Sequence, residues 1–137
     1  MRRLLGFCLL ASFATCVSAL EVDGNITVEV KKIRNKKGHI LVMAQINENS
    51  EPIYGFAKIT GHTVEVTLKG TGAQEYVISV FHDENGNWKL DTDERGIPIE
   101  GFARKNYQTD SHEPCRLKLY YPKDEELWAQ LHKSVAI

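Results

Sequence analysis

A loop rich in oxygen-bearing side chains follows an apolar segment in the second half of the chain. Its spacing approaches that of the EF-hand calcium loop, D-x-[DN]-x-[DN]-G-x5-E. The candidate ligands are Asp83, Asn85, Asn87, Lys89 through its backbone carbonyl, Asp91 and Glu94. Because Ca²⁺ takes six to eight oxygen ligands, the spacing predicts a calcium site on residues 83–94.

The loop departs from a true EF-hand in two ways. Trp88 stands where the sharp turn calls for Gly, and a bulky side chain disfavours positive φ. The residues before the loop suit a strand, whereas an EF-hand has a helix there. Two alternatives therefore stay open: a metal-free turn in which residues 85–87 supply ordinary turn chemistry, and a site for another metal with His82 as a ligand.

The remaining residues offer little for catalysis. Ser79 lies in an expected strand and lacks the G-x-S-x-G turn of a nucleophilic serine. The five histidines form no H-E-x-x-H pair. We therefore expect a non-catalytic protein. The alternative is a small metal-dependent enzyme that uses the acidic loop 83–94.

The first residues have the pattern of an export signal. Arg2 and Arg3 precede an apolar run, residues 4–17, and VSA at residues 17–19 is an A-x-A-like cleavage site. The run of about 14 residues is shorter than the roughly 20 that span a bilayer.

We therefore expect residues 1–19 to form a signal helix that is cleaved, and residues 20–137 to form one domain in the periplasm or outside the cell. An uncleaved anchor and lipid attachment at Cys16 are the alternatives. No transmembrane segment is expected in the mature chain. Removal of two arginines changes the formal net charge from −1 to −3, which gives no basic surface for nucleic acid.

The same cleavage would leave one cysteine, Cys115, so no internal disulfide can form. Cys115 alternates with Leu117 and Leu119, which places all three on one strand face. We expect a buried thiol rather than a reactive one.

Most of the remaining chain has the short, alternating apolar segments of β-strands. These segments are residues 26–30, 39–46, 54–59, 62–68, 76–81 and 115–121. The first two flank a turn in which Gly38 is free to take positive φ, and we predict that they form an antiparallel hairpin. We expect 39–46 to be central and 54–59 to lie at an edge.

Residues from the acidic loop to the following strand resemble a known signature. It comprises HDENGN at 82–87, LD at 90–91, GIP at 96–98 and EGF at 100–102. These residues resemble a family of exported bacterial proteins known as domain-of-unknown-function family 2141. The resemblance implies a transthyretin- or prealbumin-like fold and assigns no activity. Together with the strand pattern, it leads us to expect an all-β domain: a single antiparallel β-sandwich of about seven short strands.

The C-terminal segment 124–133 suits two structures. Its residues favour a helix, but Leu127, Ala129 and Leu131 alternate as in an edge strand. Guided by the resemblance, we predict a strand.

These expectations lead to a functional hypothesis: a binding or accessory module of the cell envelope, stiffened by Ca²⁺, whose partner is an envelope protein or a glycan. The aromatic residues that could form its binding face are Tyr54, Phe56, Trp88, Phe102, Tyr107 and Trp128.

Overall fold

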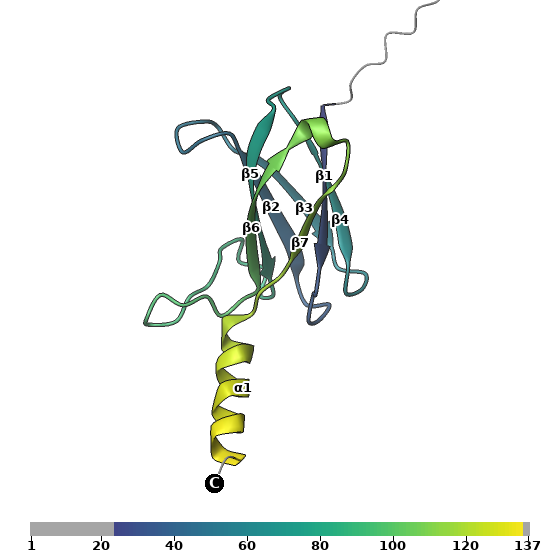
Figure 1. The fold of residues 1–137 in the computed structure, drawn as a ribbon. Coiled ribbons are helices and arrows are strands. Elements are labelled where there is room, and N and C mark those ends of the chain that lie inside the picture. The colour runs from purple at the N-terminus through teal and green to yellow at the C-terminus, as the bar shows by residue number, and fades with distance from the viewer. Residues whose placement is uncertain (1–23, 136–137) are drawn as a thin grey trace, which may run out of the picture.

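The computed structural model describes residues 24–135, which form seven strands in two sheets and a C-terminal helix (Figure 1). The strands are β1 (Asn25–Lys31), β2 (His39–Gln45), β3 (Ile53–Lys58), β4 (Val64–Lys69), β5 (Glu75–Asp83), β6 (Phe102–Gln108) and β7 (Cys115–Lys118). A 3-10 turn, η1 (Thr109–Ser111), precedes β7, and α1 (Pro122–Val135) ends the chain. The mostly β architecture is confirmed. The expected signal helix, residues 1–19, lies outside the described residues.

The two sheets have the strand orders β4-β1-β7 and β3-β2-β5-β6. β1 runs antiparallel to β4 but parallel to β7, with Val28 opposite Cys115 and Val30 opposite Leu117. The expectation of a purely antiparallel arrangement is therefore wrong. Parallel neighbours need a long connection between them, and here the chain forms β4 and the whole of the other sheet before it returns as β7.

The predicted hairpin between the first two strands is also wrong, because β1 and β2 belong to different sheets. The connection between them carries Ile33, which is buried and whose N–H bonds to the carbonyl of His62 at 3.1 Å. Ile33 therefore packs in the shared core at the point where the chain crosses from one sheet to the other. Gly38 has φ 65°, as expected, and a Cβ there would lie 1.7 Å from the carbonyl oxygen of Asp83.

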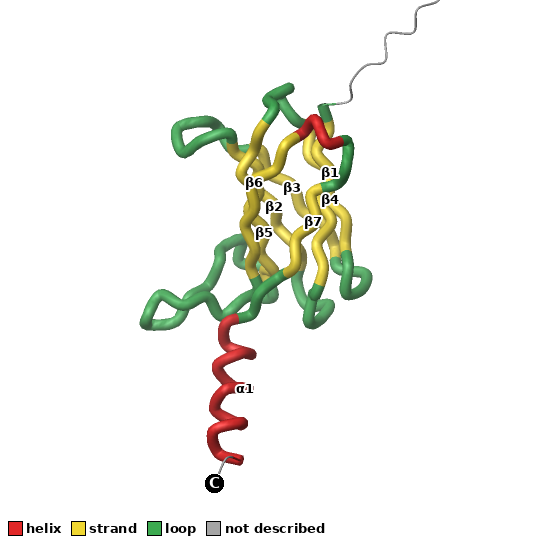
Figure 2. Tube along the Cα trace, in the orientation of Figure 1, coloured by secondary structure: helices red, strands yellow, loops and turns green. Residues whose placement is uncertain are grey.

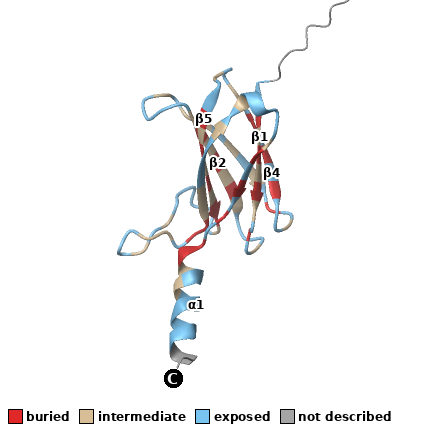
Figure 3. Ribbon diagram, in the orientation of Figure 1, coloured by how far each residue is buried: buried red, intermediate tan, exposed pale blue. Residues whose placement is uncertain are grey.

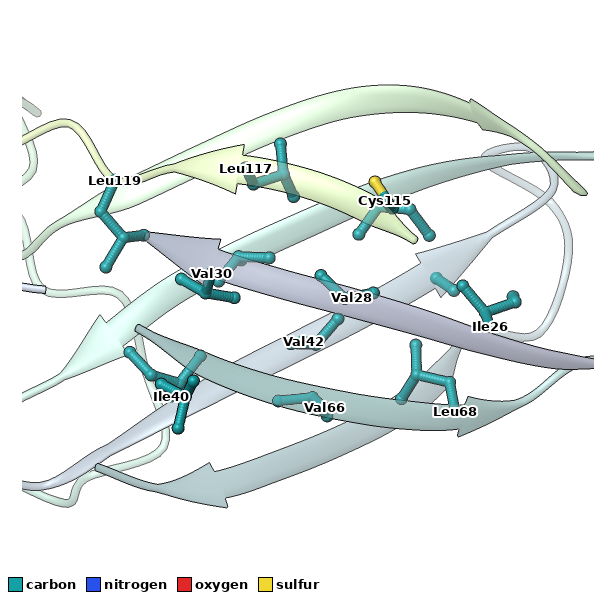
Figure 4. Close-up of a cluster of buried hydrophobic side chains, with 14 of the residues drawn as sticks. Ile26, Val28, Val30, Ile40, Val42, Val66, Leu68, Cys115, Leu117 and Leu119 are labelled. Atoms are coloured by element: carbon teal, nitrogen blue, oxygen red, sulfur yellow. The ribbon is translucent and has the colours of Figure 1, made fainter. Parts of the chain in front are cut away.

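The sheets share one core of alternating apolar side chains (Figures 3 and 4). β1, β2, β4 and β5 each bury every second residue, as strands do when one face is covered. Figure 4 shows Cys115, Leu117 and Leu119 in this cluster with Val28 and Val30. Burial raises the pKa of the Cys115 thiol, against a smaller opposing effect of the Lys105 charge. The expected burial of Cys115 is confirmed.

Within the four-stranded sheet, β2 is central and β3 lies at an edge, both as predicted. The opposite edge is β6, which the strand pattern did not reveal. Its sequence, FARKNYQ, buries no residue fully and carries consecutive Arg104 and Lys105. Charged edge strands lack clear alternation because only part of one face is covered.

The C-terminal segment is a helix, so the predicted edge strand at 124–133 is wrong. Pro122 opens α1, where its missing N–H has no helical partner to lose. The helix dipole interacts favourably with acids in the first turn, Asp124 and Glu125, and with a base in the last turn, Lys133. Figure 1 shows α1 projecting from one end of the sheets. Between residues 24 and 135, no helix has the length and apolar composition needed to cross a membrane.

Candidate functional site

The acidic loop begins with a buried carboxylate. Asp83 is the last residue of β5, and its side chain is fully buried. Its Oδ1 accepts the N–H groups of Gly86 (3.1 Å) and Asn87 (3.2 Å), and its Oδ2 accepts that of Trp88 (2.8 Å). A buried carboxylate is costly unless such donors satisfy it. Asp83 therefore folds the next five residues around itself.

Trp88 does adopt the sharp turn that a bulky residue was expected to avoid. Its φ is 63°, the left-handed conformation for which Gly is usual. Its N–H is held by Asp83, and its ring lies 4.3 Å from that of His39 and 5.5 Å from that of Phe56. These contacts offset a backbone cost of about 1–2 kcal/mol. The expectation that a bulky residue at position 88 would avoid positive φ is therefore wrong.

Two asparagines and Asp91 close the middle of the loop. The Nδ2 groups of Asn85 and Asn87 donate to Asp91 at 2.5 and 2.7 Å. Their Oδ1 atoms accept the N–H groups of Asn87 (3.1 Å) and Lys89 (3.0 Å). Four of the predicted ligands, Asp83, Asn85, Asn87 and Asp91, therefore belong to one hydrogen-bonded loop.

Glu94 takes a different place from that predicted. It lies exposed in a second turn, closed by the bond from Asp93 N–H to the Ile97 carbonyl at 2.8 Å. Over residues 24–135, no group of three or more His, Cys, Asp or Glu side chains is arranged to share a metal ion. A cation on the loop would therefore need amide and main-chain oxygens, including the carbonyl of Lys89, in addition to carboxylate oxygens.

A second buried carboxylate, Glu100, binds the loop from the other side of the turn at residues 93–97. The spacing argument did not identify this residue. It is buried, and its two oxygens accept the N–H groups of Glu84 and Asp91, each at 3.1 Å. Burial raises the pKa of Glu100, while these two bonds favour the charged form. The only sequence signal for Glu100 was its place in the family-like signature.

Hydrogen bonds and a ring contact of Arg34 connect this loop to Tyr121 and to the first turn of α1. The guanidinium bonds Glu84 at 2.6 Å and Asp124 of α1 at 2.9 Å, and it lies 4.6 Å from the centre of the Tyr121 ring. Burial opposes ionisation of Glu84, but the hydrogen bond and charge of Arg34 outweigh it and lower the pKa of Glu84. We call Arg34, Glu84, Tyr121 and Asp124 the Arg34 clasp.

Beside the Arg34 clasp, both ring nitrogens of His82 have hydrogen-bond partners. His82 is fully buried; its Nε2 lies 2.7 Å from the Lys37 carbonyl and its Nδ1 lies 3.0 Å from the Tyr121 hydroxyl. An Nε2–H donor and a Tyr121 O–H donor satisfy both contacts. Both ring nitrogens are thus engaged, so the geometry lends no support to the alternative in which His82 binds a metal.

The distal part of the loop holds the base of α1 (Figure 2). Lys123 bonds Asp93, and Arg95 bonds Glu126 at 3.0 Å. The hydrogen bond from Lys123, followed by the N–H of Ile97, keeps the pKa of Asp93 well below its usual range. The Arg95–Glu126 pair is largely exposed and adds little stability alone, whereas the Lys123–Asp93 pair is partly buried. With the Arg34 clasp, the two pairs connect the loop to the base of α1.

An apolar groove of about 600 Å³ lies on the four-stranded sheet beside the loop. Its main lining residues are Leu41, Met43, Tyr54, Phe56, Phe81 and Trp88. Cross-strand register brings them together, because Leu41 lies between Phe56 and Phe81. Tyr54, Phe56 and Trp88 are 70%, 65% and 57% exposed. We call this feature the aromatic groove.

Three of the six predicted aromatic residues thus gather in the aromatic groove. Phe102 instead packs edge-on against Tyr120, at 5.9 Å between ring centres. Tyr107 packs against the core and donates its hydroxyl to the Glu113 carbonyl at 2.6 Å. Trp128 lies on α1 and is 64% exposed.

The strained turn leads to a prediction about substitutions at Trp88. We expect Trp88→Gly to be more stable than Trp88→Ala by about 1 kcal/mol, because both lose the ring contacts but only Ala keeps the backbone cost of positive φ. Chemical denaturation of the two variants measures this difference. A Gly variant less stable than the Ala variant would contradict the assignment of strain to this turn.

The Arg34 clasp predicts a pH-dependent loss of stability. Arg34→Met should cost about 1–2 kcal/mol at neutral pH, since it removes charge-assisted hydrogen bonds that are only partly exposed. A lowered pKa means that Glu84 contributes stability above its unfolded pKa of about 4.5 and loses it as pH falls through the folded value. The cost should therefore shrink in acid.

Urea unfolding at neutral pH and in acid tests this expectation, with Arg104→Met as the matched control. Arg104 is exposed on β6, so its replacement should change the free energy of unfolding by no more than about 0.5 kcal/mol. An Arg34→Met cost that is equal at both pH values would rule out Glu84 as the titrating partner.

Comparison with known proteins identifies a family. No curated protein and no solved structure matches the chain significantly. A family model described as "Uncharacterized protein conserved in bacteria (DUF2141)" matches residues 28–118, from within β1 to the end of β7. The match spans the acidic loop, the aromatic groove and both sheets. The chain therefore belongs to this bacterial family, as the signature in the loop predicted.

Proposed function

We propose that the protein is an exported, non-catalytic binding or accessory module of the bacterial cell envelope, folded as a transthyretin-like β-sandwich. Export rests on the signal pattern of residues 1–19. The sandwich assignment is supported by two sheets that share one core. The binding role rests on one observation, the aromatic groove, because large exposed apolar patches generally mark interaction sites.

The geometry suits binding better than turnover. Tyr54, Phe56 and Trp88 present aromatic rings around a concave apolar surface, which suits the apolar faces of sugars or of a protein segment. The buried carboxylates Asp83 and Glu100 are each occupied by main-chain N–H groups. The alternative of a metal-dependent enzyme on the acidic loop gains no support from this arrangement.

The groove is tested by titration with soluble cell-wall oligosaccharides. A Trp128→Phe background leaves Trp88 as the single fluorescent tryptophan, since the chain has two. We expect a saturable change in Trp88 emission that is lost in Phe56→Ala. Tyr120→Ala, which removes an exposed aromatic outside the groove, should leave it intact. Absence of any saturable response, together with a protein that does not self-associate, would contradict the binding role.

We further propose that Ca²⁺ stiffens the loop that positions Trp88, using oxygens of Asp83, Asn85, Asn87, Lys89 and Asp91. Millimolar Ca²⁺, but not Mg²⁺, should then raise the melting temperature by several degrees. A ligand that binds only the native state adds about 2.7 kcal/mol to the free energy of unfolding when its concentration is a hundred times its Kd.

Asp91→Asn is the sharpest variant for the calcium test. Asp91 is only half-buried and its oxygens face the two asparagine amides. Asp83→Asn would instead disturb the metal-free fold, because Asp83 holds three N–H groups. Glu94→Gln, outside the hydrogen-bonded loop, is the control and should keep the shift. Equal melting temperatures in chelator and in Ca²⁺ would eliminate the calcium role.

A further inference from the structure

The helix α1 is exposed along most of its length (Figure 3), and part of its exposed surface is apolar. Leu127 and Trp128 are 57% and 64% exposed. A helix of 14 residues is about 21 Å long. Isolated helices of about this length are marginal in water, and packing of an apolar face normally supplies their stability. This face therefore calls for a partner surface.

The partner surface is not the chain's own groove. The Arg34–Asp124 bond, the Arg95–Glu126 bond and the buried ring of Tyr121 hold the base of α1 in a direction that leads away from the sheets (Figure 1). Folding back onto the groove would break these contacts at once. The cover must therefore come from another molecule.

A second copy of this chain supplies a surface of matching length and character. Strands β2 and β5 have 7 and 9 residues, so they run about 23 and 30 Å, comparable to the helix. Exposed bases border the aromatic groove: Lys58 on β3 and Arg104, which is paired with Ser79 across β5 and β6. The first turn of α1 carries the exposed acid Glu125, next to Asp124, which Arg34 already binds.

The surface area that such docking would bury is also adequate for a dimer. A large aromatic side chain buries about 150–250 Å². Reciprocal docking would cover Tyr54, Phe56, Trp88 and Trp128 in both copies, each now more than half exposed. This removes on the order of 1,000 Å² from water before Leu127 and Met43 are counted, against the roughly 1,200–2,000 Å² of a standard stable interface.

We propose that the protein forms a two-fold dimer in which α1 of each copy lies in the aromatic groove of the other. This inference rests on the proposed function, since it places a second copy in the same groove, where an oligosaccharide would compete with it. Such an interface is closed, because each subunit contributes one helix and one groove.

Sedimentation equilibrium of the chain from residue 20 onwards, which keeps every described residue, tests the dimer. We expect the wild type to dimerise. Trp128→Glu on the helix and Phe56→Glu in the groove should each weaken dimerisation at least about 30-fold, as loss of a central aromatic anchor does. Ile46→Glu, which charges an exposed apolar residue outside the groove, should leave it unchanged.

Mixing the two weakened variants gives the decisive result. A heterodimer of Trp128→Glu with Phe56→Glu has one intact helix in one intact groove, so the mixture should dimerise more tightly than either variant alone. A size tag on one variant identifies this species. Circular dichroism and melting confirm that both variants fold, and Tyr54→Lys replaces Phe56→Glu if that one does not.

The dimer would be overturned by a wild type that stays monomeric, or by a mixture of the two variants that dimerises no more tightly than either variant alone. It would also be overturned if the groove variants dimerised as the wild type does, because that result would indicate helix–helix pairing. A monomer whose Trp88 still responds to oligosaccharide would leave the binding role standing. Failure of both measurements would remove the two proposals together.

Discussion

The carboxylate of Asp83 is the interaction on which the rest of this end of the molecule depends. It is fully buried where β5 ends, and three main-chain N–H groups compensate its charge. Glu100, just before β6, accepts two more N–H groups from the same loop. An unsatisfied charge in either place would be costly. The segment between β5 and β6 therefore has one conformation that meets both demands.

Two consequences follow from that conformation. The near arm of the loop holds Trp88 over β2 and β3, against His39 and Phe56, and so completes the aromatic groove. The far arm presents Asp93 and Arg95 to the first turns of α1. One loop thus positions both the concave apolar surface and the helix that bears the other exposed apolar face. Their common origin explains why both adjoin this loop.

The candidate site was predictable only where its contacts are local. Asp83, Asn85, Asn87 and Asp91 lie within nine residues, and the spacing of short polar side chains indicates how they fold around one another. Glu94 falls outside because a separate turn, closed by Asp93 and Ile97, carries it away. Arg34 could not be found in this way, since its partners lie 50 and 90 residues further along the chain.

By itself, the sequence determined which segments form most of the strands, which of their faces are buried, and that Cys115 lies in the core. Period-two alternation encodes the burial of one strand face, and each of these properties depends on that face alone. The tertiary structure decided which strands pair, including the parallel neighbours β1 and β7, and it decided that residues 122–135 form a helix. An alternating strand fits any apolar partner, and the segment that includes Leu127 and Leu131 suits either structure. Only the competition among all segments for one core, and the ion pairs that fix α1 outside it, select between these possibilities.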